Sequence, residues 1–210
     1  FFGPLRDTVA LLRKYGITVS EEIIHKLETG VDKWKGLSKL YFDVKDKLAV
    51  LQNAEIKKIS KYETTFNEQA EIYRKAFLEK APFAFSVGPS SAYEIMDTLN
   101  LELAESEAAL KDLRAKQKLF GLIQNQGVTI KNNRADLKLL KTVWDYVDMV
   151  LWQIEDWKKL PFLEINTDDM EEVSNKFQKS IKKINNKARM WDVYNGLDVV
   201  VANFLTTLPL

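Results

Sequence analysis

Glu22 and His25 belong to the sequence Glu-Ile-Ile-His, the spacing with which carboxylate-bridged di-iron bundles supply ligands from one helix face. Such a centre needs two of these units on facing helices. His25 is the only histidine in the chain, so the second unit cannot exist. We therefore expect His25 to be an ordinary exposed or edge-packed residue, and we expect no metal site.

Two groups of carboxylates are the other candidates for chemistry. Residues 168–172 read Asp-Asp-Met-Glu-Glu, but they lack the alternating ligands, central glycine and distal glutamate of a calcium loop. Negative charge in the first turn of a helix explains them better, because it faces the positive end of the helix dipole. The adjacent Glu155 and Asp156 have no predicted pocket or basic partner, which indicates solvated charges rather than an acid–base pair.

No nucleotide site is evident in the sequence. The pattern G-x-x-x-x-G-K-[ST] is absent, and Gly30 and Gly36 lie in amphipathic helical context. The chain also has no cysteine, which excludes disulfides, a thiol nucleophile and zinc thiolates. We expect no catalytic residue, no cofactor-binding residue and no enzymatic activity of this segment.

The overall charge limits the classes of partner. Thirty-one basic and thirty acidic residues give a net charge of +1, so no global field attracts nucleic acid or an anionic membrane. The uncharged run 199–210 is too short to span a bilayer, which takes about twenty apolar residues. We expect protein partners. The start at Phe1 and the apolar end Leu208-Pro209-Leu210 also favour a piece of a longer polypeptide.

The elements that must position these residues are all helical. Eight glycines and five prolines leave long stretches without breakers, and apolar residues recur with the period of a helix. We expect helices over 5–15, ending at Gly16, and from Ser20 to Gly30. From 31 to 80 a long helix carries a coiled-coil-like seam that slips in phase near Glu55; the seam comprises Trp34, Leu37, Tyr41, Val44, Leu48 and Leu51.

The next helix follows a loop between Pro82 and Pro89. Ser91 and Glu94 have the spacing of a capping box, and heptad-spaced apolar residues then continue to Phe120. We predict that this helix is the antiparallel partner of the long one. The fold class is therefore an all-α, elongated helical bundle with a long antiparallel helix pair, followed by a second set of helices.

Residues 121–133, with Gly127 and paired asparagines, are the best candidate boundary. We divide the chain into a bundle over 1–126 and a second region over 127–210. The second region should hold one helix over about 134–159, which Pro161 ends, and another over about 168–206, which Gly196 bends or breaks.

The five tryptophans are the strongest candidates for contacts. Trp34, Trp144 and Trp191 fall on apolar stripes, which favours core packing, and Leu140 and Phe177 share that prediction. Trp152 lies off its stripe and Trp157 lies at the end of its helix. We predict that these two contact a different bundle or a neighbouring domain, although large aromatic residues also bury well at bundle corners.

Residues 135–210 contain a series of short apolar helical strings whose order and spacing are informative. They read ADLKLLKTVWDYV, WQIEDWKKLPF, DDMEEVSNKFQKSI, RMWDVYNGL and NFLTTLPL, and FGPLRDTVALLRKYG, KAPF and KLFGL precede them. No single string is diagnostic, but their order and spacing resemble dynein heavy chains. The similarity covers nearly the whole chain, and residues 2–16 look closer to axonemal than to cytoplasmic dyneins.

This resemblance implies a location and a role. Residues 1–126 would be tail or neck bundle, and 127–210 the N-terminal part of the linker, which in this family swings over the AAA+ ring during ATP-driven movement. The resemblance implies an axoneme in a cilium or flagellum (alternatively, the cytoplasm). The implied partners are the rest of the heavy chain, including the ring, and other dynein heavy, intermediate or light chains. Microtubules and ATP with magnesium would bind elsewhere in such a chain.

Composition and periodicity alone leave other classes open. A spectrin-like scaffold or tethering rod fits the same pattern of helices. A membrane-curving module fits less well, since it needs a cationic face, and lysine and arginine are interspersed with acidic residues on every long helix.

Overall fold

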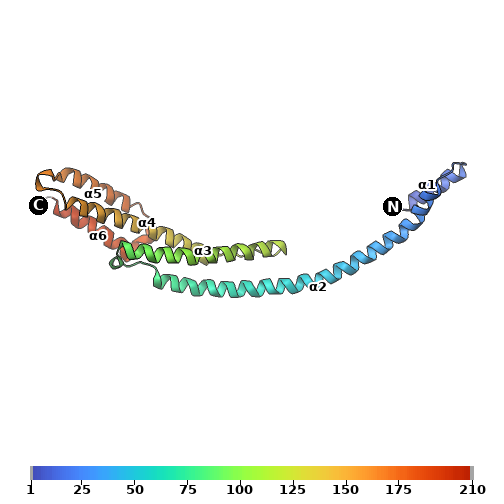
Figure 1. Ribbon diagram of the computed structural model, residues 1–210, viewed down its shortest axis with the longest axis horizontal. Helices are drawn as coiled ribbons and strands as arrows, with labels where there is room; N and C mark the ends of the chain where they lie inside the picture. The colour runs from blue at the N-terminus through green and yellow to red at the C-terminus, as the bar shows by residue number, and fades with distance from the viewer. Residues whose placement is uncertain (1, 209–210) are drawn as a thin grey trace. The chain divides into compact units, whose positions relative to one another are not determined.

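The computed structural model describes residues 2–208, with the side chain of Phe162 left out. Within that range the regular elements are α-helices and short 3-10 helices, with no strand. The predicted all-α class is confirmed. The elements (Figure 1) are α1 (Phe2–Lys14), α2 (Glu21–Lys80), η1 (Phe85–Val87), α3 (Pro89–Leu119), α4 (Val128–Trp157), η2 (Phe162–Glu164), α5 (Thr167–Ile181), η3 (Asn186–Met190) and α6 (Asp192–Thr207).

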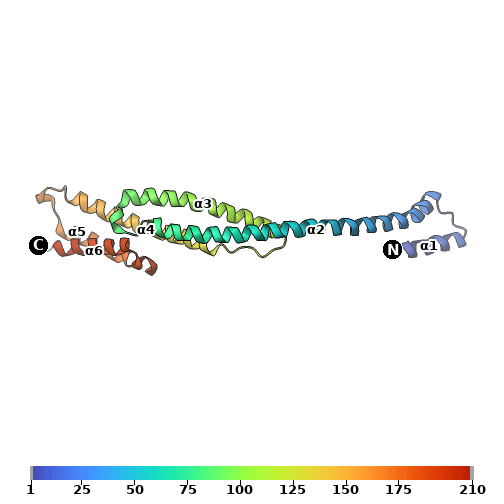
Figure 2. The same cartoon turned by 90° about the horizontal axis from the view of Figure 1, so that it is seen from below.

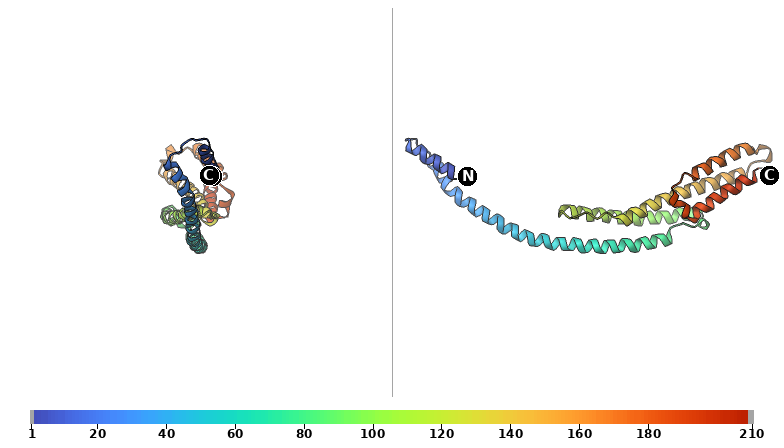
Figure 3. Two further views of the ribbon diagram at one scale, coloured as in Figure 1. Left: turned by 90° about the vertical axis from the view of Figure 1, so that its right-hand side faces the viewer. Right: turned by 180° about the vertical axis from the view of Figure 1, so that it is seen from behind.

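The chain divides into two compact units, Phe1–Ser60 and Lys61–Leu210. In the first unit, α1 folds back on the beginning of α2 (Figure 3). Gly16 makes this turn in the left-handed region with a φ of 76°, and the Ile17 amide donates to the Leu12 carbonyl at 3.0 Å. This is the glycine-terminated helix end that the sequence predicts.

The predicted helix end at Gly30 is wrong, because α2 continues through Gly30 and Gly36 to Lys80. A glycine inside a helix costs only about 1 kcal/mol relative to alanine, so two isolated glycines do not end a helix of 60 residues. Gly30 also accommodates a neighbour: a Cβ there would lie 3.0 Å from the Phe2 ring. The missing side chain therefore lets α1 approach α2 closely.

The second unit begins with residues 61–80 of α2, which run beside α3 and α4 (Figure 2). α3 packs most extensively against α4. The contact between α2 and α3 includes Tyr73, whose hydroxyl donates to the Leu99 carbonyl at 3.2 Å. The antiparallel pair predicted for α2 and α3 is thus part of a three-helix arrangement.

The start of α3 differs from the predicted capping box. Gly88, with a φ of 77°, is the N-cap residue and makes no side-chain cap, and Pro89 follows at the first helical position. Ser91 therefore lies within the first turn instead of capping it. Proline at that position costs no hydrogen bond, since its missing amide proton would have no partner inside the helix.

The predicted single helix over 168–206 is two helices, α5 and α6, separated by residues 182–191. The connecting segment turns because Ile184 and Ala188 are buried, and Asn185 accepts from the Lys187 amide at 3.0 Å. Gly196 lies inside α6 and does not interrupt it. The helix α4 likewise begins at Val128, earlier than predicted.

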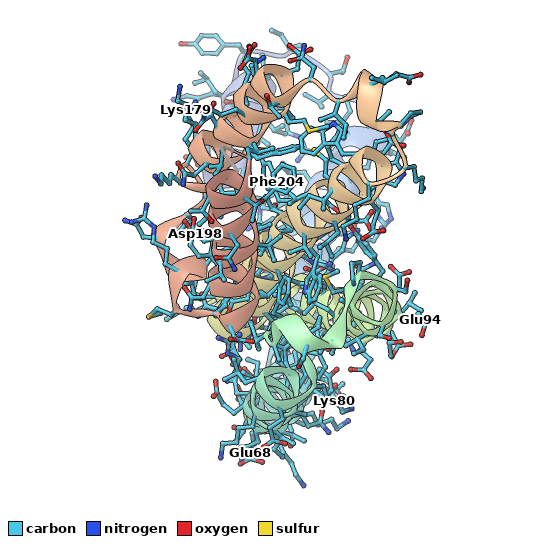
Figure 4. The ribbon with its side chains drawn as sticks, turned by 90° about the vertical axis from the view of Figure 1, so that its left-hand side faces the viewer. Glu68, Lys80, Glu94, Lys179, Asp198 and Phe204 are labelled. Atoms are coloured by element: carbon cyan, nitrogen blue, oxygen red, sulfur yellow. The ribbon has the colours of Figure 1, made fainter. Side chains whose placement is uncertain are left out.

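The helices α4, α5 and α6 enclose the second part of the core. In an end-on view Phe204 lies toward the interior, while Glu68, Glu94 and Lys179 lie at the periphery (Figure 4). The fully buried side chains of this unit include Phe77, Leu99, Leu140, Trp144, Ile181 and Leu197. Among the described residues, no helix has the length and hydropathy of a membrane span.

Candidate functional site

A buried carboxylate joins three segments of the second unit. Asp136 of α4 is 2% exposed and accepts a 2.8 Å hydrogen bond from the Arg74 guanidinium of α2. Arg74 also donates to the side-chain oxygen of Asn133 at 2.6 Å. Lys187 of η3 pairs with the other Asp136 oxygen. We call these four residues the Asp136 junction.

The position of Asp136 explains why it needs two cationic partners. It lies on the buried face of α4, next to Leu137 and one turn from Leu140. A charge there is costly unless it is paired and hydrogen-bonded. Arg74 suits this task because its planar fork donates to two acceptors at once. The junction can therefore fix the register of α2 and η3 on α4.

The loop after α2 forms a second connection to the helices beyond residue 127. Trp144 of α4 donates from its indole nitrogen to the Pro82 carbonyl at 2.8 Å. The Phe83 carbonyl accepts from the Val193 amide at 2.8 Å, and the Phe83 ring lies 5.0 Å from the Trp191 ring. This loop is thus held by backbone and aromatic contacts together.

Phe85 of the same loop reaches the first turns of α6. Its amide donates to the Asp192 carboxylate at 2.9 Å. Its ring lies against Gly196, where a Cβ would come within 2.3 Å of it. The glycine that the sequence suggested as a bend is therefore a point of close contact between loop and helix.

The turn between α3 and α4 is also fixed by polar contacts. Arg114 donates to the carbonyls of Asn125 and Gln126, each at 2.7 Å. The buried Gln117 accepts from the Asn125 amide at 2.8 Å, and the Asn125 side chain donates to Asn67 of α2 at 2.8 Å. The segment predicted as a boundary is therefore an ordered turn within the unit.

Arg134 and Glu107 link α3 to α4 through two parallel hydrogen bonds of 2.8 Å each. The hydrogen bond from Arg134 holds the pKa of the Glu107 carboxyl below its usual range. Burial raises the pKa of Tyr73 to about 12, and the negative charge of Glu102 adds to that rise. Tyr93 donates to Asp145 at 2.7 Å, and burial is the main cause of its raised pKa.

Open grooves lie on the surface of this unit. One of about 300 Å³ is lined by Tyr62, Phe66, Tyr73, Ser106 and Ile130, among others. No group of three or more histidine or carboxylate side chains among residues 2–208 is placed to hold a metal ion. The arrangement is suited to joining helices.

Comparison with known proteins identifies the class of chain. Residues 130–210 match the family described as "Dynein heavy chain, N-terminal region 2". The chain is 36% identical over 208 residues to "Dynein beta chain, ciliary" of Tripneustes gratilla, covering 99% of this chain and 5% of that protein. It is 33% identical over 222 residues to "Dynein beta chain, flagellar outer arm" of Chlamydomonas reinhardtii, covering 100% of this chain and 5% of that protein.

The chain belongs to the dynein heavy-chain family. It spans about 5% of the length of these relatives. A third relative, "Dynein axonemal heavy chain 11" of Sus scrofa, is 30% identical over 207 residues, covering 99% of this chain and 4% of that protein. All three are ciliary, flagellar or axonemal by name, which supports the predicted location in an axoneme.

The side chains predicted to pack in the core of this dynein segment occupy different environments. Leu140 and Trp144 are fully buried, at 0% exposure. Phe177 and Trp191 are half-buried, and Trp191 contacts Phe83. Trp34 is 61% exposed, so its predicted core position is wrong within the described residues: its apolar stripe has no covering helix there.

The two tryptophans predicted to contact other parts of dynein also differ. Trp152 is 64% exposed on α4. Trp157 stacks on Phe204 of α6, with ring centroids 5.1 Å apart and planes 15° from parallel. One face of Trp157 is therefore used within the unit. The role of both residues in contacts with a neighbouring bundle or domain stays a prediction.

Sequence reasoning missed the residues of the Asp136 junction. Its signal is nevertheless present, because Asn133 and Asp136 interrupt a helical face that otherwise carries Ile130, Leu137, Leu140 and Trp144. A polar residue on such a face indicates a buried partner. Nothing in the spacing identifies Arg74 or Lys187, which lie about fifty to sixty residues away, as the partners.

Proposed function

We propose that this chain is a non-catalytic mechanical segment of an axonemal dynein heavy chain, coupling the tail to the linker that swings over the AAA+ ring. The contribution of the second unit is a stiff joint. It holds residues 61–80 of α2, which belong to the predicted tail region, together with α4 and η3 of the predicted linker region.

The Asp136 junction carries this proposal. Its members come from both sides of the predicted boundary at residue 127, and the buried carboxylate binds cations from both. Removing one member of a buried ion pair leaves an uncompensated charge. Sliding of α2 along α4 would separate Arg74 from Asp136 and leave the buried carboxylate with less compensating charge. The junction therefore resists this movement.

The loop contacts add a second restraint at a different point. Trp144 binds the Pro82 carbonyl, and the Val193 amide binds the Phe83 carbonyl, each at 2.8 Å. Two restraints spaced along one helix resist rotation as well as sliding. A spectrin-like scaffold would also need packed helices, but it would not require charged side chains from both regions at one buried point.

The partners in this proposal are the rest of the heavy chain, including the AAA+ ring, and other dynein heavy, intermediate or light chains. ATP with magnesium and microtubules bind elsewhere in the parent protein. The segment itself supplies no cofactor site, and no nucleic acid or membrane takes part.

The test introduces Arg74→Met into the parent heavy chain. We expect slower microtubule gliding with basal ATP turnover unchanged, because the ring is intact while the joint yields under load. Lys176→Met is the matched control, since Lys176 makes only an exposed ion pair with Glu172 at 2.6 Å. Equal gliding velocities for wild type and Arg74→Met would overturn the proposed coupling role.

A further inference from the structure

A stripe of large side chains on α2 in the first unit lies open to solvent. We call it the α2 seam, and its members are Trp34, Leu37, Tyr41, Val44, Leu48 and Leu51. They recur at alternating steps of three and four, which is the spacing of a coiled-coil interface. Each is between 44% and 63% exposed. A stripe of this length is large for a free surface and is typical of an interaction site.

The same helix face is covered by a helix just before the seam begins. Val9 and Ala10 of α1 and Ile24 and Leu27 of α2 line one groove, and Phe2 lies against Gly30. Leu27 precedes Trp34 by one heptad, so it occupies the equivalent position. The seam therefore continues an existing helix–helix interface beyond the part that α1 covers.

The edges of the α2 seam carry lysine side chains, whereas aspartate side chains lie on the opposite side of the helix. At about 100° per residue, Lys45 and Lys47 fall on either edge of the apolar stripe. Asp32, Asp43 and Asp46 fall on the far side. No ion pair within residues 2–208 reaches Lys45 or Lys47. Both edge cations are thus available to an incoming partner.

We propose that the α2 seam docks an amphipathic protein helix whose apolar stripe is flanked by acidic residues. Residues at the edges of a coiled-coil seam form the ion pairs that choose the partner, and here those edges offer lysine and no carboxylate. A second copy of this chain would bring the same lysines to the shared seam without an opposite charge. This surface goes beyond the coupling role of the second unit.

The experiment uses two fluorescent three-heptad peptides that share leucine at the seam positions. One carries glutamate at every edge position and the other carries lysine. Binding to the 210-residue chain is measured by fluorescence anisotropy at low and high salt. We expect the glutamate peptide to bind about tenfold more tightly, and we expect salt to reduce this preference because the pairs are exposed.

Variants locate the binding on the seam. Val44→Glu with Leu48→Glu should abolish binding of the glutamate peptide, and glutamate keeps the helix propensity high. Lys45→Glu with Lys47→Glu should reverse the preference between the peptides. Lys35→Glu with Lys39→Glu makes the same change of charge on the far side of α2. This control should leave the preference for the glutamate peptide unchanged. Circular dichroism checks that each variant stays helical.

Three results would overturn the proposal. These are equal affinity for the two peptides, no binding of either, and a stable dimer of the chain alone that Val44→Glu with Leu48→Glu converts to monomer. The last would assign the seam to a second copy. Because these measurements need no motor activity, they are independent of the gliding test of the coupling role.

Discussion

The two units of this chain carry similar helical patterns but use them differently. In the first unit the seam residues from Trp34 to Leu51 are exposed, whereas in the second unit the apolar faces of α3 and α4 are buried against each other. Helical periodicity determines which residues share a face. It does not determine whether another helix covers that face.

The largest expected difference between the units concerns two tryptophans. Trp144→Ala should lower the free energy of unfolding by about 3–5 kcal/mol, because it empties a fully buried volume and removes the hydrogen bond to Pro82. Trp34→Ala and Trp152→Ala should each cost less than about 1 kcal/mol. Urea denaturation followed by circular dichroism measures all three. A loss at Trp34 as large as that at Trp144 would contradict the contrast between the units.

The Asp136 junction gives the next largest effect. Arg74→Met should cost about 3 kcal/mol, the low end for breaking a buried ion pair, since Lys187 still contacts Asp136. The matched exposed pair in the first unit is Lys26 with Glu22, and Lys26→Met should leave stability nearly unchanged. Urea denaturation measures the free energy of unfolding of both variants. Equally small losses for Arg74→Met and Lys26→Met would show that the junction contributes little to stability.

Two glycines should respond to alanine with opposite sign. Gly127 has a φ of 56°, and a Cβ there would lie 2.2 Å from Leu110. Gly127→Ala should therefore destabilise the chain by about 1–2 kcal/mol. Gly36 lies inside α2 with nothing within 4 Å of its Cβ position, so Gly36→Ala should stabilise the helix by about 0.5–1 kcal/mol. Thermal unfolding of both variants tests this, and a gain for Gly127→Ala would contradict the turn geometry.

The smallest effect is a dependence of stability on pH. The pKa of Glu107 is lowered in the folded state by Arg134. The stabilisation of the folded state by ionised Glu107 is therefore fully present above the ordinary carboxyl pKa. It is lost as pH falls through the lowered folded value. Because the Glu107 side chain is 41% exposed, we expect less than about 1 kcal/mol. Unfolding curves at several pH values for wild type and Glu107→Gln should converge at low pH, and a constant difference would contradict this cause.

The sequence predicted the helices better than their connections. Gly16 and Pro89 mark real helix boundaries because each imposes a local backbone condition, positive φ for one and a missing amide proton for the other. Gly30 does not, since a glycine ends a helix only where the following chain turns away. The break at 182–191 was missed because burial of Ile184 and Ala188, a tertiary effect, decides it.

The candidate site was less accessible from the sequence than the fold. Trp144 was predicted to be buried from its stripe alone. The Asp136 junction depends on contacts between α2, α4 and η3, which are distant in sequence, and no local rule supplies those pairings. Asn133 and Asp136 on an otherwise apolar face of α4 were the available signal.

Hydrogen–deuterium exchange along the 210-residue chain tests the central claim most directly, namely that the Asp136 junction joins α2 to the helices beyond residue 127. We expect amides of residues 61–80 to exchange slowly, together with those of α4. Arg74→Met should accelerate exchange in both segments and in η3, and leave residues 31–55 unchanged. Independent, rapid exchange of residues 61–80 in the wild type, at the rate of residues 31–55, would contradict the account.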